Sequence, residues 1–274
     1  MSILKIAMIG DLFGRTGCAL FARHSASLKK EHDLDAIIVN GENTADGKGI
    51  THKIAAFLTQ HGAAVVTTGN HVWAKKEVIP HFNEQEIIVR PANYPDTCPG
   101  KGMTFFMCKG VTVCVINLMG RVFMPSTLDC PLKKAEALLL DAHKITPIIL
   151  IDMHAETSHE KLTLAYALDG KVTAVVGTHT HVQTADARML PLGTGYMSDL
   201  GMAGSLNSMI GAQKEGLLQK FLTQMPTKHE EAIDAPYVLS GAIITIDGST
   251  GKALTLEPFR IIDHEPLSMK ERKW

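Results

Sequence analysis

Each of five short apolar runs in this chain is followed, within a few residues, by side chains that can bind a metal ion. The runs are Ile3 to Ile9, Ala36 to Val39, Ala64 to Val66, Ile148 to Ile151 and Ala174 to Val176. They are rich in Ile and Val without strict alternation, which is typical of strands buried on both faces of a sheet. Because ligands collect beyond the carboxyl ends of strands in an open α/β sheet, we expect these side chains to meet in one place.

Segments with helical spacing alternate with the strands, and this order predicts a layered α/β fold flanked by helices. The expected helices are 15–31, 52–61, 74–82, 132–144 and 158–168, with Thr51 and Ser158 as N-caps. Residues 89–104 and 119–131 are expected to be mostly loop, with a strand at Val111 to Leu118 between them. Runs at 238–246 and 253–262 predict a C-terminal β-hairpin. We expect the segment 203–214 to be exposed, as a mobile loop near the site or a subunit contact.

Composition places the chain among ordinary proteins of the cytoplasm. Of the 274 residues, 45% are hydrophobic and 20% charged, and the net charge of -1 argues against binding nucleic acid or an anionic membrane by charge alone. The five cysteines lack paired spacing, which indicates a reducing compartment. Residues 1–10 read as a first strand rather than a signal peptide, and no run reaches the roughly 20 apolar residues that cross a bilayer. We expect a single domain over 1–274, which could form a homo-oligomer.

The residues that follow the strands form a plausible set of metal ligands. They are Asp11, Glu42, Asn70, His154, His179 and His181. One histidine at a strand end is more often structural, but burying six such polar groups separately would be costly. Their mixture of nitrogen and oxygen suits Fe, Mn or Zn better than Mg or Ca, and the sequence does not select among the three.

Particular positions suggest particular roles. Glu42 is the best candidate to bridge two ions, which lie roughly 3.5 to 4 Å apart in two-metal sites. His71 adjoins Asn70 and could protonate a leaving oxygen, or it could be a structural residue packed against Trp73. Asn43 is either a ligand or a residue that orients Glu42.

Other candidates are weaker. Asp152 and Glu156 flank His154 and could hold its ring, although a solvated or capping role is as good an interpretation. Arg90, Arg121 and Lys101 could contact a phosphate, but surface cations are the commoner case. The segment Gly10 to Gly17 lacks the Lys-Ser/Thr ending of a phosphate-binding P-loop, so we reject a nucleotide loop there.

These residues, in this order, resemble the calcineurin-like metallophosphoesterase superfamily. The matching stretches are Gly10-Asp11, Gly41-Glu42-Asn43, Gly69-Asn70-His71, Asp152-Met153-His154 and Gly177-Thr178-His179-Thr180-His181. Phe13 stands where the superfamily commonly has a histidine, and Glu42-Asn43 follows Gly41 in place of an aspartate. Those departures, together with the segments 38–45, 90–95, 154–156 and 178–186, resemble the bacterial YmdB-like branch over nearly the whole chain.

The resemblance implies a dinuclear metal-dependent phosphodiesterase for cyclic nucleotides, with 2',3'-cyclic nucleotides as the expected substrates and iron or manganese in the site. By analogy, Asp11, Glu42, Asn43 and His181 would bind one ion, while Glu42, Asn70, His154 and His179 would bind the other. A hydroxide between the ions would attack phosphorus, and His71 would be the general acid. Two alternatives stay open: a phosphomonoesterase, and a metal-binding regulatory protein with slight or incidental catalysis.

Overall fold

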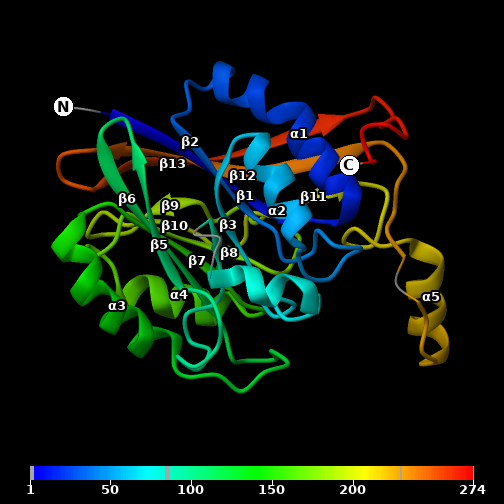
Figure 1. The fold of residues 1–274 in the computed structure, drawn as a ribbon, viewed down its shortest axis with the longest axis horizontal. Helices are drawn as coiled ribbons and strands as arrows, with labels where there is room; N and C mark the ends of the chain where they lie inside the picture. The colour runs from blue at the N-terminus through cyan, green and yellow to red at the C-terminus, as the bar shows by residue number, and fades with distance from the viewer. Residues whose placement is uncertain (1–2, 84–86, 229, 274) are drawn as a thin grey trace.

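Two β-sheets face each other in this computed structural model, which describes residues 3–83, 87–228 and 230–273 (Figure 1). The first sheet has the order β13-β12-β11-β1-β2-β3-β4 and the second has the order β5-β6-β7-β8-β10-β9. The strands of the first sheet are β1 (Ile3–Leu12), β2 (Ala36–Asn40), β3 (Ala63–Thr67), β4 (Ile88–Val89), β11 (Met202–Ser205), β12 (Tyr237–Asp247) and β13 (Ala253–Asp263). Those of the second are β5 (Met103–Cys108), β6 (Val111–Met119), β7 (Ile149–His154), β8 (Ala174–Thr178), β9 (Arg188–Met189) and β10 (Gly195–Met197).

Helices cover the outer face of each sheet, so the layers run helix, sheet, sheet, helix (Figure 1). The helical elements are α1 (Gly14–Glu31), α2 (His52–Gln60), η1 (Lys76–Asn83), α3 (Pro131–Ile145), α4 (Ser158–Ala167) and α5 (Lys214–Thr223). One core lies between α1, α2 and the first sheet, a second between the two sheets, and a third between α3, α4 and the second sheet. Both central sheets are therefore buried on two faces, as their unbroken Ile and Val runs predicted.

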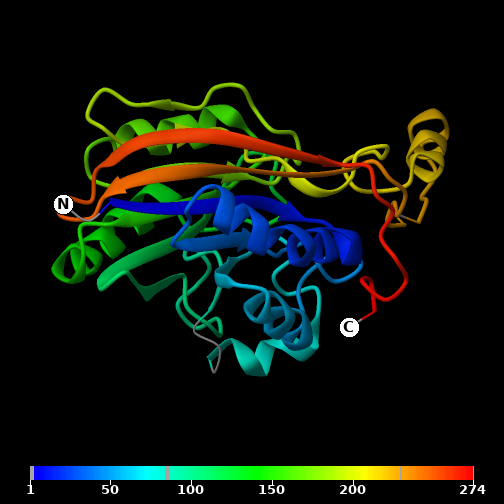
Figure 2. The same cartoon turned by 90° about the horizontal axis from the view of Figure 1, so that it is seen from above.

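The expected α/β organisation is confirmed, with one correction to its geometry. All five apolar runs are strands, but β1, β2 and β3 belong to the first sheet while β7 and β8 belong to the second. The ligand-bearing strand ends therefore meet between two sheets rather than along a single one. The C-terminal hairpin is also confirmed, because β12 and β13 pair antiparallel from Tyr237 to Asp263 and lie side by side in Figure 2.

Local expectations were confirmed in part. The Thr51 hydroxyl caps α2 by accepting from the Ile54 N–H at 3.2 Å, as predicted. The cap of α4 is Thr157 rather than Ser158, because Ser158 is already the first helical residue. In place of the helix predicted at 74–82, Lys76–Asn83 form a 3₁₀ helix, η1, which contains Pro80. Proline removes an amide donor and so disfavours the α-helix expected there.

The segment 203–214 is only partly the exposed loop that we expected. Its first three residues belong to β11 and are buried, because this strand lies between β1 and β12 in the first sheet. The short strand Met202–Ser205 was missed because its small side chains carry little apolar signal. The strand β5 likewise begins inside the predicted loop 89–104. Among the described residues, no helix combines the length and apolar character needed to cross a lipid bilayer.

Candidate metal centre

His154 is the centre of a first group of ligand atoms. Its Nε2 lies 3.0 Å from Asn70 Oδ1, 3.1 Å from Glu42 Oε1 and 3.1 Å from His179 Nδ1. These residues come from the ends of β2, β3, β7 and β8, so both sheets contribute. Both His154 and Glu42 are buried, which leaves little room for water to satisfy their polar atoms.

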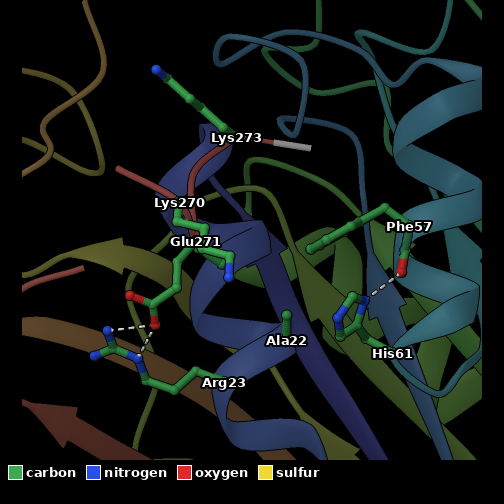
Figure 3. Close-up of a pocket in the computed structure, with 8 residues that line it drawn as sticks. Ala22, Arg23, Phe57, His61, Lys270, Glu271 and Lys273 are labelled. Carbon is green, nitrogen blue, oxygen red and sulfur yellow. Dashed lines mark hydrogen bonds and ion pairs between the residues drawn. The ribbon is translucent and has the colours of Figure 1, made fainter. Parts of the chain in front are cut away.

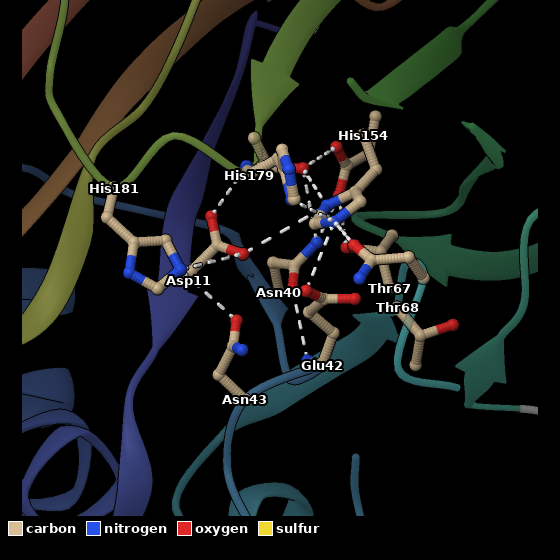
Figure 4. A network of polar contacts seen from close by, with 12 residues as sticks. Asp11, Asn40, Glu42, Asn43, Thr67, Thr68, His154, His179 and His181 are labelled. Carbon is tan, nitrogen blue, oxygen red and sulfur yellow. Dashed lines mark hydrogen bonds and ion pairs between the residues drawn. The ribbon is translucent and has the colours of Figure 1, made fainter. Parts of the chain in front are cut away.

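His181 belongs to a second group beside the first. Its Nε2 lies 3.2 Å from Asn43 Oδ1 and 3.8 Å from Asp11 Oδ1 (Figure 4). Asp11 connects the groups, because its Oδ1 also lies 4.0 Å from His154 Nδ1. All seven proposed ligands thus lie close together, with Glu42, Asn70 and His179 around His154, and Asn43 and Asp11 near His181.

The donor chemistry of both groups fits a cation. Two acceptor oxygens and an imidazole nitrogen surround His154 Nε2. A single proton on Nε2 can make one well-directed hydrogen bond and cannot satisfy all three atoms. Asp11 Oδ1 is buried and has no hydrogen-bond partner among the described residues. Such an atom is costly unless something positive faces it, and an ion between the carboxylates would do so.

The pKa values of the metal-free protein show the same demand for positive charge. Burial would lower the pKa of His154, but Glu42 and Asp11 raise it to about 9. Burial would raise the pKa of Glu42, but His154 and the His71 N–H lower it to about 2. The His154 imidazolium therefore balances the charge of Glu42, while burial raises the pKa of Asp11 to about 6, and a metal ion would take the place of the proton on His154.

A buried carboxylate fixes the orientation of His154 from behind. Asp152 accepts hydrogen bonds from the Asn40 amide, the Thr67 hydroxyl and the Thr178 hydroxyl. Because Thr178 gives its proton to Asp152, its oxygen must accept from His154 Nδ1, at 2.9 Å. Nε2 then faces the ligand group, as in metal sites where a carboxylate orients a histidine. The sequence reading raised this role for Asp152 but missed its three polar partners.

The turn that carries His179 and His181 has an unusual backbone. The φ angles are +103° at His179 and +64° at His181, a region that residues other than glycine rarely adopt. Two buried carboxylates hold it: Asp11 Oδ2 accepts from the His179 N–H and Asp199 Oδ2 from the Thr180 N–H, both at 3.0 Å. The strain is thus maintained by the surrounding hydrogen bonds.

Asp199 depends in turn on a lysine that sequence reasoning missed. Lys161 Nζ lies 2.9 Å from Asp199 Oδ2, and both side chains are 1% exposed. Fully buried lysines are rare, and nothing in the helical spacing of α4 marks Lys161 as different from a surface residue. The pair joins α4 to the turn of the ligand histidines.

We predict that Lys161→Met destabilises the fold by about 3–5 kcal/mol, because it leaves the Asp199 carboxylate buried without its cation. Urea unfolding of the metal-free chain measures this loss. The exposed Lys171, also near α4, supplies the control, and Lys171→Met should change stability by less than about 0.5 kcal/mol. Equal effects of the two substitutions would show that the ion pair contributes little.

His71 lies beside the two groups without joining either. Its backbone N–H donates to Glu42 Oε2 at 3.1 Å, and its ring Nε2 is 3.4 Å from the Asn70 side-chain nitrogen. Burial lowers the pKa of His71, although Glu42 acts in the opposite direction. Trp73, against which the structural interpretation packed the His71 ring, lies edge-on against Tyr94, with ring centroids 5.5 Å apart.

A cavity of about 630 Å³ opens over both groups. Its lining includes His71, His179 and His181, together with Lys48, Lys220 and Glu231. A second cavity of about 450 Å³ lies between α1, α2 and the C-terminal segment (Figure 3). There Arg23 donates to Glu271 and Asp263, so its guanidinium holds the chain end. Among the described residues, the cluster that could hold a metal ion, Glu42, His154 and His179, lies at the first cavity.

The weaker candidates are placed as follows. Arg90 is buried, and its guanidinium donates to the carbonyls of Pro99, Pro91 and Cys98, so it holds a loop together. Glu156 Oε2 lies 3.1 Å from His179 Nε2, where it can orient that ring. A phosphate contact by Arg121 or Lys101 stays a prediction.

Three comparisons with known proteins agree with this geometry. The family model described as YmdB-like protein matches residues 7–259. The 2',3'-cyclic-nucleotide 2'-phosphodiesterase of Bacillus subtilis (strain 168) is 44% identical over 95% of this chain and 98% of its own. A solved structure of a novel phosphatase from Mycoplasma pneumoniae is 33% identical, covers 97% of this chain and 96% of its own, and superposes with a TM-score of 0.90. The calcineurin-like phosphoesterase YfkN from Bacillus subtilis, 11% identical over 96% of this chain and 90% of its own, shares the fold with a TM-score of 0.61.

Proposed function

This chain belongs to the YmdB-like protein family, and from that premise we propose that it is a dinuclear metal phosphodiesterase acting on 2',3'-cyclic nucleotides. The observation that carries the proposal is the arrangement of ligand atoms in two adjacent groups around His154 Nε2 and His181 Nε2, with the Glu42 carboxylate at His154 and the Asp11 carboxylate near both histidines. The family resemblance and the calcineurin-like fold expected from the sequence are confirmed.

We assign the ligands to two ions. Asp11, Glu42, Asn43 and His181 would hold one, and Glu42, Asn70, His154 and His179 the other. The distances are compatible with this division, since Asn43 and Asp11 lie near His181 while Glu42, Asn70 and His179 lie near His154. Glu42 is buried and negatively charged, which suits a metal-binding carboxylate, and its sharing by the second ion is part of the proposal.

The chain's own residues would complete the chemistry. When bound, the ions would supply Lewis acidity, which lowers the pKa of water and stabilises negative charge on phosphoryl oxygens. The His71 ring borders the cavity, so it can donate a proton to the departing ribose oxygen. Its backbone N–H donates to Glu42 Oε2, and this hydrogen bond fixes the position of the proposed proton donor relative to the ligand Glu42.

The finer properties remain part of the proposal. Iron is the first expectation for the metal because the family resemblance implies it, with manganese or zinc as alternatives, and the mixture of imidazole and oxygen ligands suits all three. We also propose that residues 1–274 form one domain, that the protein acts in the cytoplasm, and that it could assemble as a homo-oligomer.

Metal analysis of the purified chain, coupled to hydrolysis assays, tests the proposal. We expect about two ions per chain, as in other two-metal sites, with turnover of bis-p-nitrophenyl phosphate and of 2',3'-cyclic AMP. Turnover of p-nitrophenyl phosphate alone would favour a phosphomonoesterase. Bound metal with no hydrolysis of any phosphoester would favour the metal-binding regulatory protein.

A further inference from the structure

The connection between β11 and β12 leaves the sheet and returns to it at nearly the same point. The two strands pair with each other, and the Leu206 N–H donates to the Pro236 carbonyl at 2.8 Å where the connection begins and ends. Between these points the described residues of 206–236, which we term the excursion, include α5. Figure 1 shows α5 standing away from the other elements. None of the residues of α5, all of them described, is buried.

Among the described residues, the Glu231 carboxylate attaches the excursion to the body of the protein beside the candidate metal centre, in addition to hydrogen bonds from Arg272 to the Ile233 carbonyl and from Ser205 to the Asp234 carbonyl. Glu231 Oε2 accepts from the Arg15 N–H at 3.1 Å, and Glu231 Oε1 accepts from the Thr16 N–H at 2.6 Å. These amides belong to the first turn of α1. Its N-cap residue, Phe13, makes no side-chain capping hydrogen bond, and the first turn holds no acidic residue. Glu231 therefore satisfies amides that the helix leaves unpaired, and favours the positive end of its dipole.

The close approach depends on Gly14. Its φ of +61° is one that glycine adopts readily, and a Cβ at this position would lie 2.2 Å from Glu231 Oε2. The lack of a side chain at Gly14 therefore makes room at the start of α1 for the Glu231 carboxylate.

Hydrogen bonds inside the excursion connect Glu231 to a ligand histidine. The Ala232 N–H donates to the Gly211 carbonyl at 2.9 Å, next to Ile210. The Ile210 carbonyl accepts from His181 Nδ1 at 2.8 Å, which leaves His181 Nε2 to face Asn43. The excursion thus orients one of the proposed metal ligands through its backbone.

The excursion also forms one wall of the cavity over the metal centre. Its contributions to the lining are Ile210, Ala212, Leu217, Lys220, Thr227 and Glu231. The lining also includes Phe13 and the segment 46–48. Because no residue of α5 is fully buried, we expect the excursion's part of the lining to depend more on the hydrogen bonds at the base of the excursion than on packing of the helix.

We propose that Glu231 is a positioning residue, which fastens the substrate-facing wall of the cavity to the N-terminus of α1 and thereby holds His181 in place. The attachment by Glu231 does not depend on the proposed function. Only its expected effect on turnover rests on that function. Without the Glu231 carboxylate, the excursion should open more often, the cavity wall should be less ordered, and His181 should lose its backbone acceptor part of the time.

Hydrogen exchange tests the fastening without reference to activity. In Glu231→Ala, the amides of Gln213 and Ala232, both hydrogen-bonded within the excursion, should exchange roughly tenfold faster, as expected for the loss of a helix-capping interaction. Glu230→Ala is the matched control, because the Glu230 side chain is exposed and, among the described residues, pairs with Lys228. Amides of β1 should not change in either variant. Unchanged exchange in Glu231→Ala would overturn the proposal.

Kinetics on 2',3'-cyclic AMP tests the consequence. We expect KM to rise by roughly tenfold and kcat to fall less in Glu231→Ala, with the metal content retained and Glu231→Gln intermediate, since glutamine keeps one acceptor oxygen. Faster exchange with unaltered KM and kcat would refute the positioning role. Faster exchange in a protein whose wild type hydrolyses no phosphoester would instead count against the proposed function and leave the fastening intact.

Discussion

Replacing Glu42 with alanine should abolish phosphodiester hydrolysis and leave the chain unable to retain its full metal content. Its carboxylate is 1% exposed, and its Oε1 lies 3.1 Å from His154 Nε2. Removing it takes away the buried negative charge at His154 and, in the proposed assignment, the carboxylate that both ions would share. We expect a loss of roughly 10³-fold or more in kcat, because single electrostatic contacts at reacting centres contribute ~10²–10³.

Metal analysis and turnover of bis-p-nitrophenyl phosphate, measured on the same preparations, check this expectation. Glu42→Gln keeps the shape and removes the charge, so it should lose nearly as much as the alanine variant. Glu257→Ala, at an exposed position of β13, controls for the loss of a glutamate and should behave as the wild type. If Glu42→Ala kept normal metal and normal turnover, the assignment of Glu42 would be wrong.

Sequence patterns predicted the strand ends well, because a buried apolar run is followed there by a metal-binding type of side chain. Runs such as Ile148 to Ile151 read as two-faced strands, and the histidine that follows marks the end. The division of those strands between two sheets could not be predicted, because such a run reports that both faces are covered and says nothing about which strand is its neighbour. Only the three-dimensional arrangement showed that β3 and β7 converge from different sheets.

The groups that hold the proposed ligands in position were not predicted from the sequence, for a different reason. Lys161 and Glu231 look like surface residues in sequence, since their partners lie 38 and more than 200 residues away. The Ile210 carbonyl is a backbone group, and no side-chain pattern can mark it. Thr178 was quoted as part of a motif, but its role between Asp152 and His154 depends on two hydrogen bonds that the spacing does not specify.

The substitution His71→Gln separates proton donation from metal binding. The variant keeps the backbone N–H that donates to Glu42 Oε2, and its side-chain oxygen can still accept from Asn70. We therefore expect normal metal content. Turnover of 2',3'-cyclic AMP should fall by about 10²–10⁴, which is the usual contribution of a general acid.

Substrates with different leaving groups distinguish the two possible roles of His71, which are proton donation and a purely structural role. A ribose oxygen departs poorly without a proton, whereas p-nitrophenolate departs readily, so His71→Gln should impair bis-p-nitrophenyl phosphate hydrolysis far less than 2',3'-cyclic AMP hydrolysis. His143→Gln, at an exposed position of α3, serves as the control and should affect neither substrate. Equal losses on both substrates with normal metal would assign His71 to holding Glu42 and the cavity, and loss of metal would make it a ligand. A selective loss requires a proton from this ring, because no change in metal binding or in folding would distinguish the two leaving groups.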